Sequence, residues 1–595
     1  MRTRIVQTSM AKGEISPTLH GRTSTEIYQD GVEKATNTIV MPHGGLRRRA
    51  GMQKITDSFI GTTAETRLEP FVFSRDQAYL MVFQNNSIKV YFEGALQATV
   101  VSTYTSSELK DIDVIQTADV LIMVHEDHAP ATLTRGATHA DWTIADIPLV
   151  GIPTYIYDTV AEPVWSATRG YPRTCTFHKG RLWFGGSKSR VSSVWGSVVN
   201  DFYNFAIGAG ADSEAIFDTI ETDDYNEING IISAGSLQVY TSSQEFYNDV
   251  DFITPAESSW KSYSTTGCKR IRPLFLNGAT LYIDSSGRTL RQTTYNDGEK
   301  TYTPTNASLL SSHLLTDVVS TAMIKGTSVD FSDLVFVVNA DGTVAVLNTL
   351  RNEGIHGWTQ WSTDGAFIDV AVVDKDVYFL VNRRGSLFIE KLTEGTYSDH
   401  NTIVEGTPPV TDNIVFGLDN ITFNGDNIVF KDPTTGSPIT SITTNINDSI
   451  SNTQYWRVIA DNSIMPIALP ISDGVNLNHF DIGREAYSAE VGLDYEVVIR
   501  TLPLNASTKE NGSIVNLRKR VNRVILRLHE SLGVKVQDSI MNDRKFIVSL
   551  DKAPIPFTGI KELYLLGYGR LVTIEVSQDD PLPLILLSID AEVEF

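Results

Sequence analysis

Two histidines stand close enough in the sequence to share a metal ion. His125 and His128 are three residues apart, a spacing that brings both imidazoles to one face of a helix. Their context is instead the end of a strand followed by a loop that leads into Pro130. Because proline and turn residues end regular structure, this context favours a solvated loop over a metal site.

A second stretch is rich in carboxylates. Glu221, Asp223, Asp224 and Glu227 offer the hard oxygen ligands that calcium prefers. Their spacing does not follow the twelve-residue calcium loop, so we expect an exposed acidic loop here.

The motifs of several enzyme classes are absent from the sequence. There is no glycine-rich dinucleotide fingerprint after a strand, no phosphate-binding P-loop and no Gly-x-Ser-x-Gly nucleophile elbow. Carboxylate pairs for glycoside hydrolysis could form in three dimensions, which a sequence does not show. We therefore predict that the chain is not an enzyme and that it has no cofactor, catalytic or metal site.

Two basic clusters stand out. One lies between residues 42 and 51, and the other leads into a strand near residue 520. Each is either a charged, solvated strand face or a contact to carboxylates or phosphates. Because the chain is acidic, carboxylates on sister subunits are the simpler target. The candidate assembly interface consists of Arg47, Arg48, Arg49, Arg518, Lys519, Arg520 and Arg523.

Composition narrows the function classes. The 595 residues include 71 acidic and 49 basic side chains, which gives a net charge of −22. A chain this acidic is poorly suited to clamping nucleic-acid phosphates. The N-terminus lacks an apolar signal region, and no apolar run is long enough to span a bilayer. We expect a soluble protein without stable membrane insertion.

The cysteine count excludes further site types. Cys175 and Cys268 are too few for a disulfide framework or a thiolate zinc site. They could form one bridge, but two buried free thiols are the favoured alternative.

Alternating β-branched and aromatic residues around turn residues predict seven hairpins. These begin near residues 79, 120, 181, 237, 281, 334 and 377. Their mean spacing is about 50 residues, close to the length of a four-stranded propeller blade. An irregular β-propeller is therefore the first interpretation of this region, and a pair of β-sandwiches is the second.

The fold class is all-β, with a propeller-like body, a small β insertion and a C-terminal β domain. A change to a sequence rich in Thr, Asn, Ile and Asp after residue 400 marks the insertion. The clearest helix lies near residues 25–35, opened by Ser24 or Thr25. The expected divisions are an N-terminal segment with this short helix (1–50), the body (51–400), the insertion (401–490) and the C-terminal platform (491–595).

Several segments, in their order along the chain, resemble one family of virion proteins. With these segments the sequence is similar to the tail nozzle proteins of short-tailed bacteriophages, also called tail tubular protein B. The resemblance covers roughly residues 10–250 and 490–595 and excludes 400–490. The segments are 11–22, 42–51, 70–74, 125–130, 177–187, 195–205, 501–504, 518–523 and 580–584.

The resemblance implies a structural protein of the virion tail, made in the host cytoplasm. Members form a homohexameric tube below the portal and its adaptor ring, and tail fibres or spikes attach near that junction. Double-stranded DNA passes through the lumen, which is closed before ejection. A lumen of negative charge would repel phosphates and let DNA slide. The alternatives are a receptor-binding adhesin and a polysaccharide-degrading propeller enzyme of the tail.

Overall fold

A computed structural model gives the fold. It describes most of the chain, and its contacts divide the chain into two units. Unit 1 comprises residues 1–11, 23–59 and 390–595, and unit 2 comprises residues 12–22 and 60–389. The described residues are 2–55, 65–326, 332–405 and 421–594, without 424–425, 429–437, 445–455, 462, 466–470, 473–477, 506, 509–511, 514–516, 543–553 and 566.

Unit 2 contains seven successive groups of antiparallel strands among its described residues, which we number as blades 1 to 7. Blades 1 to 5 are separate four-stranded sheets, and the strands of blades 6 and 7 belong to larger sheets. Each of the seven predicted hairpins forms the second and third strands of one blade. Turn residues close these hairpins. Asn86, for example, adopts a φ of 54° between β8 (Gln77–Gln84) and β9 (Ser87–Phe92), a conformation that asparagine tolerates better than most residues.

The blades follow the order of the sequence. Blade 1 consists of β7 (Arg67–Ser74), β8, β9 and β10 (Ala95–Val101). Blade 2 consists of β11 (Asp113–Thr117), β12 (Val120–His125), β13 (His128–Arg135) and β14 (Trp142–Asp146). Blade 3 consists of β17 (Thr174–His178), β18 (Arg181–Gly185), β19 (Ser193–Gly196) and β20 (Ile216–Thr219). Blade 4 consists of β21 (Ile228–Ser233), β22 (Leu237–Thr241), β23 (Glu245–Asn248) and β24 (Trp260–Ser264). Blade 5 consists of β25 (Leu274–Leu276), β26 (Ala279–Ile283), β27 (Leu290–Asn296) and β28 (Thr301–Asn306). Blade 6 consists of β29 (Val318–Ile324), β30 (Asp333–Asn339), β31 (Val344–Leu350) and β32 (Ile355–Trp361). Blade 7 consists of β33 (Ala366–Val373), β34 (Asp376–Arg383) and β35 (Ser386–Thr393).

Other elements of unit 2 connect or extend the blades. They are β2 (Gly13–Glu14), which pairs with β32, the hairpin of β15 (Thr154–Tyr157) and β16 (Val160–Pro163), and short 3-10 helices at Pro17–Leu19, Leu109–Asp111, Leu309–Leu314 and Arg351–Glu353.

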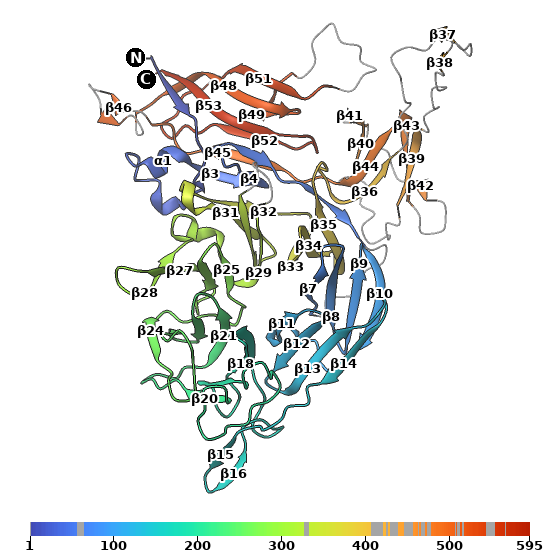
Figure 1. Ribbon diagram of the computed structural model, residues 1–595. Helices are drawn as coiled ribbons and strands as arrows, with labels where there is room; N and C mark the ends of the chain where they lie inside the picture. Colours follow the sequence, from blue (N-terminus) through green and yellow to red (C-terminus); the bar gives the residue numbers. More distant parts are fainter. Residues whose placement is uncertain are drawn as a thin grey trace. The chain divides into compact units, whose positions relative to one another are not determined.

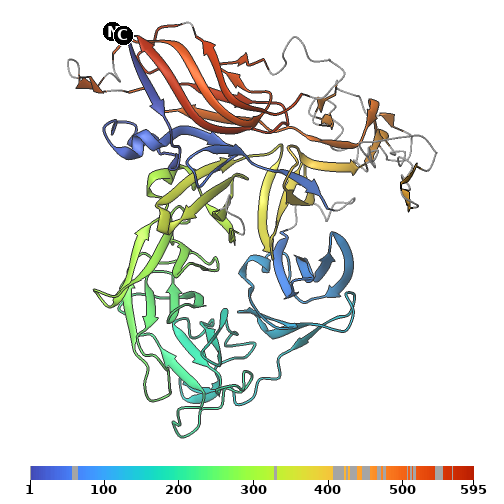
Figure 2. The same ribbon diagram turned by 45° about the horizontal axis from the view of Figure 1, so that its top comes forward.

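The blades of unit 2 close into a ring. The first strand of blade 7, β33, lies beside both β29 of blade 6 and β7 of blade 1. The backbone N–H of Leu68 on β7 donates to the Asp369 carboxylate on β33 at 2.7 Å. Figure 2 shows the blades following one another around this ring. The predicted β-propeller is confirmed, and the alternative of two β-sandwiches is wrong.

Apolar side chains hold the neighbouring blades together. Blades 1 and 2 share one buried cluster that includes Phe71, Tyr79 and Trp142, with ring centroids 5.0 to 6.1 Å apart. Cys175 belongs to a second cluster under blades 2 and 3. Both cysteines are buried and free, as the sequence predicted.

Unit 1 is built from both ends of the chain. Its first sheet runs β4 (Thr38–Val40), β5 (Leu46–Arg48), β53 (Ile585–Glu594), β48 (Arg520–Ser531) and β51 (Phe557–Tyr564), and β1 (Arg2–Gln7) also pairs with β53 (Figure 1). A second sheet contains β3 (Gly31–Thr36), β45 (Val497–Thr501), β52 (Glu575–Gln578), β49 (Lys535–Val536) and β50 (Ser539–Ile540). The two sheets bury one common core that includes Val32, Val497, Leu526 and Val593.

The remaining strands of unit 1 form smaller sheets. They are β6 (Gly51–Lys54), β36 (Asp399–Glu405), β44 (Ser488–Leu493), β40 (Trp456–Ala460) and β41 (Ser463–Ile464) in one; β39 (Ile439–Thr444), β43 (Asn478–Ala486) and β42 (Ile471–Ser472) in another; and the pairs β37 (Ile421–Phe423) with β38 (Asp426–Ile428) and β46 (Ser507–Thr508) with β47 (Gly512–Ser513).

The expected divisions differ from the observed units. The N-terminal segment 1–50 is shared between the two units, and the main segment of unit 2 spans residues 60–389 instead of the expected 51–400. Much of the expected insertion, 401–490, lies outside the described residues. The expected helix is shorter than predicted, because α1 spans Glu26–Asp30 and the next residues enter β3 to pair with β45. No helix of the described residues is long and apolar enough to cross a membrane.

His178 on β17 should make the stability of unit 2 depend on pH. Its side chain is buried and its Nδ1 lies 2.9 Å from the Ser233 hydroxyl. Burial, with a smaller effect of Lys179, lowers the pKa of His178 to about 4. The neutral ring stabilises the fold fully above pH 6.5, and this stabilisation is lost as the pH falls towards 4.

We expect the free energy of unfolding of unit 2 to fall by about 2 kcal/mol between pH 7 and pH 5 through this group. His178→Asn, which keeps an acceptor near Ser233, should remove most of that pH dependence. The exposed His529 of unit 1 gives the control, His529→Asn. Urea unfolding at both pH values, followed by tryptophan fluorescence, measures the difference. An unchanged pH dependence in His178→Asn would contradict the prediction.

Candidate functional site

The first basic cluster is mostly buried inside unit 1. Arg48 ends β5 and Arg49 follows it, and their exposed fractions are 4% and 0%. Neither guanidinium reaches the surface, so Arg48 and Arg49 cannot form the subunit contact that the sequence predicted. Arg47 remains partly accessible and pairs with Glu394, Nη2 to Oε1, at 3.1 Å.

Arg49 forms a buried ion pair with a residue far along the chain. Its Nη1 and Nη2 donate to the two carboxylate oxygens of Asp399 at 2.7 and 2.6 Å. The guanidinium also lies over the ring of Tyr495, 3.6 Å from its centroid, and the Tyr495 hydroxyl donates to the Arg49 carbonyl at 2.7 Å. This bidentate geometry suits arginine and not lysine.

Arg48 satisfies its donors mainly on C-terminal backbone. It donates to the side chain of Gln578 at 2.8 Å, to the carbonyl of Asp580 at 3.0 Å and to the carbonyl of Tyr495 at 3.0 Å. A fourth bond reaches the carbonyl of Tyr397 at 3.1 Å. The two arginines therefore join the 42–51 segment to three later segments, at residues 397–399, 495 and 578–580, a role that spacing along the sequence did not reveal.

Some residues of the second basic cluster are buried, and others are exposed at the surface. Lys519 is buried, and burial lowers its pKa to about 8. Arg518 is exposed, Arg520 is half-buried, and Arg523 pairs with Glu562 at 3.1 Å and with Glu592 at 3.5 Å. Of the predicted interface residues, Arg47, Arg518, Arg520 and Arg523 remain accessible to another subunit.

An apolar surface that the sequence analysis missed lies beside the second basic cluster. The edge strand β51 pairs with β48 on one side, and no other described strand pairs with it. Its side chains alternate between half-buried and exposed, and Ile560 and Tyr564 are 54% and 73% exposed. We call the exposed apolar residues of this region the apolar edge: Ile555, Ile560, Tyr564, Tyr568 and Leu571.

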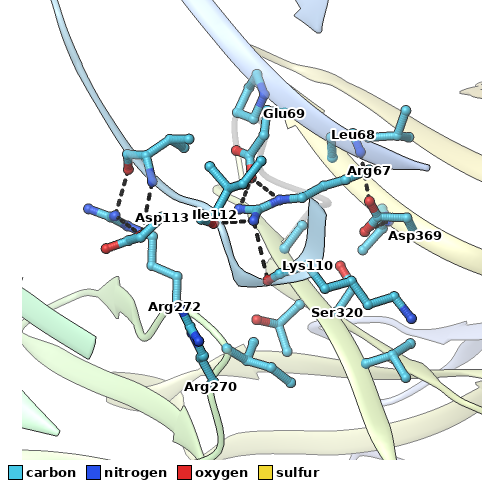
Figure 3. Close-up of a pocket in the computed structure, with 18 of the residues that line it drawn as sticks. Arg67, Leu68, Glu69, Lys110, Ile112, Asp113, Arg270, Arg272, Ser320 and Asp369 are labelled. Atoms are coloured by element: carbon cyan, nitrogen blue, oxygen red, sulfur yellow. Dashed lines mark hydrogen bonds and ion pairs between the residues drawn. The ribbon is translucent and has the colours of Figure 1, made fainter. Parts of the chain in front are cut away.

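The centre of unit 2 holds a cavity of about 400 Å³ lined by first strands of the blades and the residues next to them. Charged side chains from separate blades meet there (Figure 3). Arg67 donates to Glu69 at 2.7 Å and to the carbonyl of Leu109 at 3.1 Å. Burial raises the pKa of Asp369, which accepts the Leu68 N–H described above.

Asp113 connects three blades at this cavity. It accepts from Arg272 Nη1 at 2.6 Å, from the Thr174 hydroxyl at 2.5 Å and from the Cys175 N–H at 2.9 Å. Each of these contacts comes from a segment that enters a different blade from Asp113. The charged groups of the cavity therefore fasten the ring, and this use needs no bound substrate.

The predicted acidic loop is confirmed. Glu221, Asp223 and Asp224 are exposed, and Glu227 forms an ion pair with Arg173.

The predicted solvated loop at His125 and His128 is wrong for the first histidine. His125 is only 3% exposed, and the two residues face each other across the end of the β12–β13 hairpin.

The chain matches known proteins only among solved structures. No protein-family model matches the chain, and no curated protein matches it. Among solved structures, the WD40 repeats of RRP9 align with a TM-score of 0.36 and 9% identity over 58% of this chain and all of that chain. BBS1N, solved in complex with ARL6DN, aligns with a TM-score of 0.34 and 9% identity over 58% of this chain and 98% of that one. These values are too low to carry an argument, so the propeller is assigned from its own seven blades.

Proposed function

We propose that this protein is a structural subunit of a bacteriophage tail and assembles into a closed ring or tube that conducts DNA. The observation that carries the assembly part is the apolar edge on β51. An exposed apolar strand edge readily pairs with another chain. We take the partner to be a second copy of this chain, because a ring of identical subunits covers every such edge with the same contact.

The segments that carry the sequence resemblance support the proposal that this is a subunit of a bacteriophage tail. Segment 42–51 and segment 580–584 are separated by most of the chain, yet Arg48 donates to the carbonyl of Asp580. Segments 177–187 and 195–205 form adjacent strands of blade 3, where Phe184 pairs with Trp195. Residues that carry the resemblance thus form the packing of each unit, as expected for a shared fold.

In this proposal the subunits form a hexamer beneath the portal-adaptor ring in the virion tail, and double-stranded DNA passes through the lumen. Tail fibres or spikes attach at its junction with the adaptor. The accessible Arg518, Arg520 and Arg523 lie near the apolar edge in the sheet order and offer cations to an acidic neighbouring subunit. The net charge of −22 per chain disfavours adhesion of DNA to the lumen.

The mass of the purified protein in solution, with negative-stain images of the same sample, tests the proposal. We expect rings or short tubes of about six copies. Adding the adaptor ring of the same phage should stack the two kinds of ring. An elongated trimer that binds or degrades polysaccharide would contradict the proposal and favour an adhesin or an enzyme.

A further inference from the structure

The end of the β12–β13 hairpin holds two imidazoles side by side. His125 ends β12 and His128 begins β13, so only Glu126 and Asp127 connect the strands. The register pairs His125 directly with His128. Residues that lie opposite each other in an antiparallel pair point to the same face of the sheet. The two ring centroids are accordingly 5.3 Å apart.

A carboxylate completes this cluster from another segment. Glu108 precedes the 3-10 helix Leu109–Asp111, and its Oε2 lies 3.2 Å from Nε2 of His128. The N–H and hydroxyl of Thr105 hold the same oxygen at 2.7 and 2.8 Å. One ligand atom from each of Glu108, His125 and His128 lies within 4.8 Å of the other two. Ligands of a tetrahedral zinc ion are about 3.3 Å apart, so small side-chain rotations suffice.

The charges around the cluster permit a cation. Arg270 would repel a cation, but it is itself within 3.5 Å of carboxylate oxygens of Asp111 and Glu126.

A buried tyrosine ring packs against the two histidines. The Tyr104 side chain is 1% exposed, and its hydroxyl has no hydrogen-bond partner among the described residues. Its ring centroid lies 4.8 Å from that of His128 and 6.3 Å from that of His125. A buried hydroxyl without a partner costs about 1–3 kcal/mol.

We propose that Glu108, His125 and His128 bind one zinc ion, with water as the fourth ligand. Two imidazoles and one carboxylate suit zinc, whereas calcium and magnesium prefer oxygen ligands alone. The ion takes the His125 lone pair that now accepts the Asp127 N–H at 3.1 Å. Asp127 is exposed, so its N–H can bond to water instead. The zinc fastens the connection between blades 1 and 2 to the tip of the β12–β13 hairpin.

Zinc titration of the full chain tests this site. After treatment with a chelator and desalting, the protein competes with a chromophoric chelator for Zn²⁺. We expect one zinc ion per chain in the wild type, and at least about tenfold weaker binding in Glu108→Gln and in His128→Asn. The matched control is Asp119→Asn, which removes one exposed carboxylate at the other end of β12 and should bind zinc as the wild type does.

A second measurement distinguishes the loss of a zinc ligand from the loss of the fold. Zinc should raise the melting temperature of the wild type and of Asp119→Asn but not that of Glu108→Gln or His128→Asn, while all four remain folded by circular dichroism. The proposal is overturned if the wild type binds no zinc, if both ligand variants bind it with unchanged affinity, or if excess magnesium displaces it. None of these outcomes depends on ring assembly, so the site and the proposed function are tested separately.

Discussion

Ile560→Lys should convert the assembled protein into single chains. The Ile560 side chain is 54% exposed on the edge strand β51, and a contact with a second copy would bury it. Losing that burial costs about 2 kcal/mol at each contact, or roughly 30-fold in the association constant, and placing an ammonium group there costs more. Every contact of a ring loses the same amount, so the whole ring is destabilised.

Ile156→Lys provides the control for that variant. Ile156 on β15 is 66% exposed, so the substitution makes the same change of side chain at a similarly exposed site of unit 2. Light scattering and negative-stain images of both variants and the wild type measure the assembly, and circular dichroism verifies the fold. If Ile560→Lys formed the same particles as the wild type, the apolar edge would not be the assembly contact.

Arg49→Leu should strongly destabilise unit 1. It leaves the carboxylate of Asp399, which is 0% exposed, without the bidentate partner that lies 2.6 Å away. Removing one partner of a buried ion pair costs about 3–5 kcal/mol. Hydrogen exchange of peptides from β44, β45 and β53 is the suitable measurement, because it reports the opening of each segment separately. We expect faster exchange there and little change in the blades of unit 2.

Two further variants make the test of the ion pair specific. Arg47→Leu removes a cation whose partner Glu394 is 61% exposed, and we expect a loss below about 1 kcal/mol. The double variant Arg49→Leu with Asp399→Leu removes both charges and should recover part of the stability lost in Arg49→Leu. Equal exchange rates in Arg49→Leu and Arg47→Leu would contradict a stabilising role of the buried pair.

Local patterns in the sequence predicted the blades well. Each hairpin needs only two alternating strands and a turn that accepts positive φ, and these features are adjacent in the sequence, as at Asn86. Ring closure was harder to predict, because it depends on the contact of Leu68 with Asp369, about 300 residues away. The helix near Thr25 was predicted too long because pairing of β3 with β45 overrides local helix propensity.

The site residues were harder to predict than the fold. Arg47, Arg48 and Arg49 were predicted to lie at the surface, because three adjacent cationic side chains are usually exposed to solvent. Its burial depends on Asp399 and Tyr495, which are distant in the sequence. The spacing of His125 and His128 was compared with a helix, whereas the same spacing across a two-residue turn pairs them on one face of a hairpin.

The pairing of β1 with β53 has a consequence for the synthesis of the protein. Blades 1 to 7 use residues that leave the ribosome before β48 and β53 do, so the propeller can fold while translation continues. The sheet that carries the apolar edge cannot form until β53 has emerged, because β53 lies between β5 and β48 and also pairs with β1. A chain interrupted before β53 would therefore lack the completed edge. In the ring that we propose, such an incomplete chain would not be incorporated, because its assembly contact would be missing.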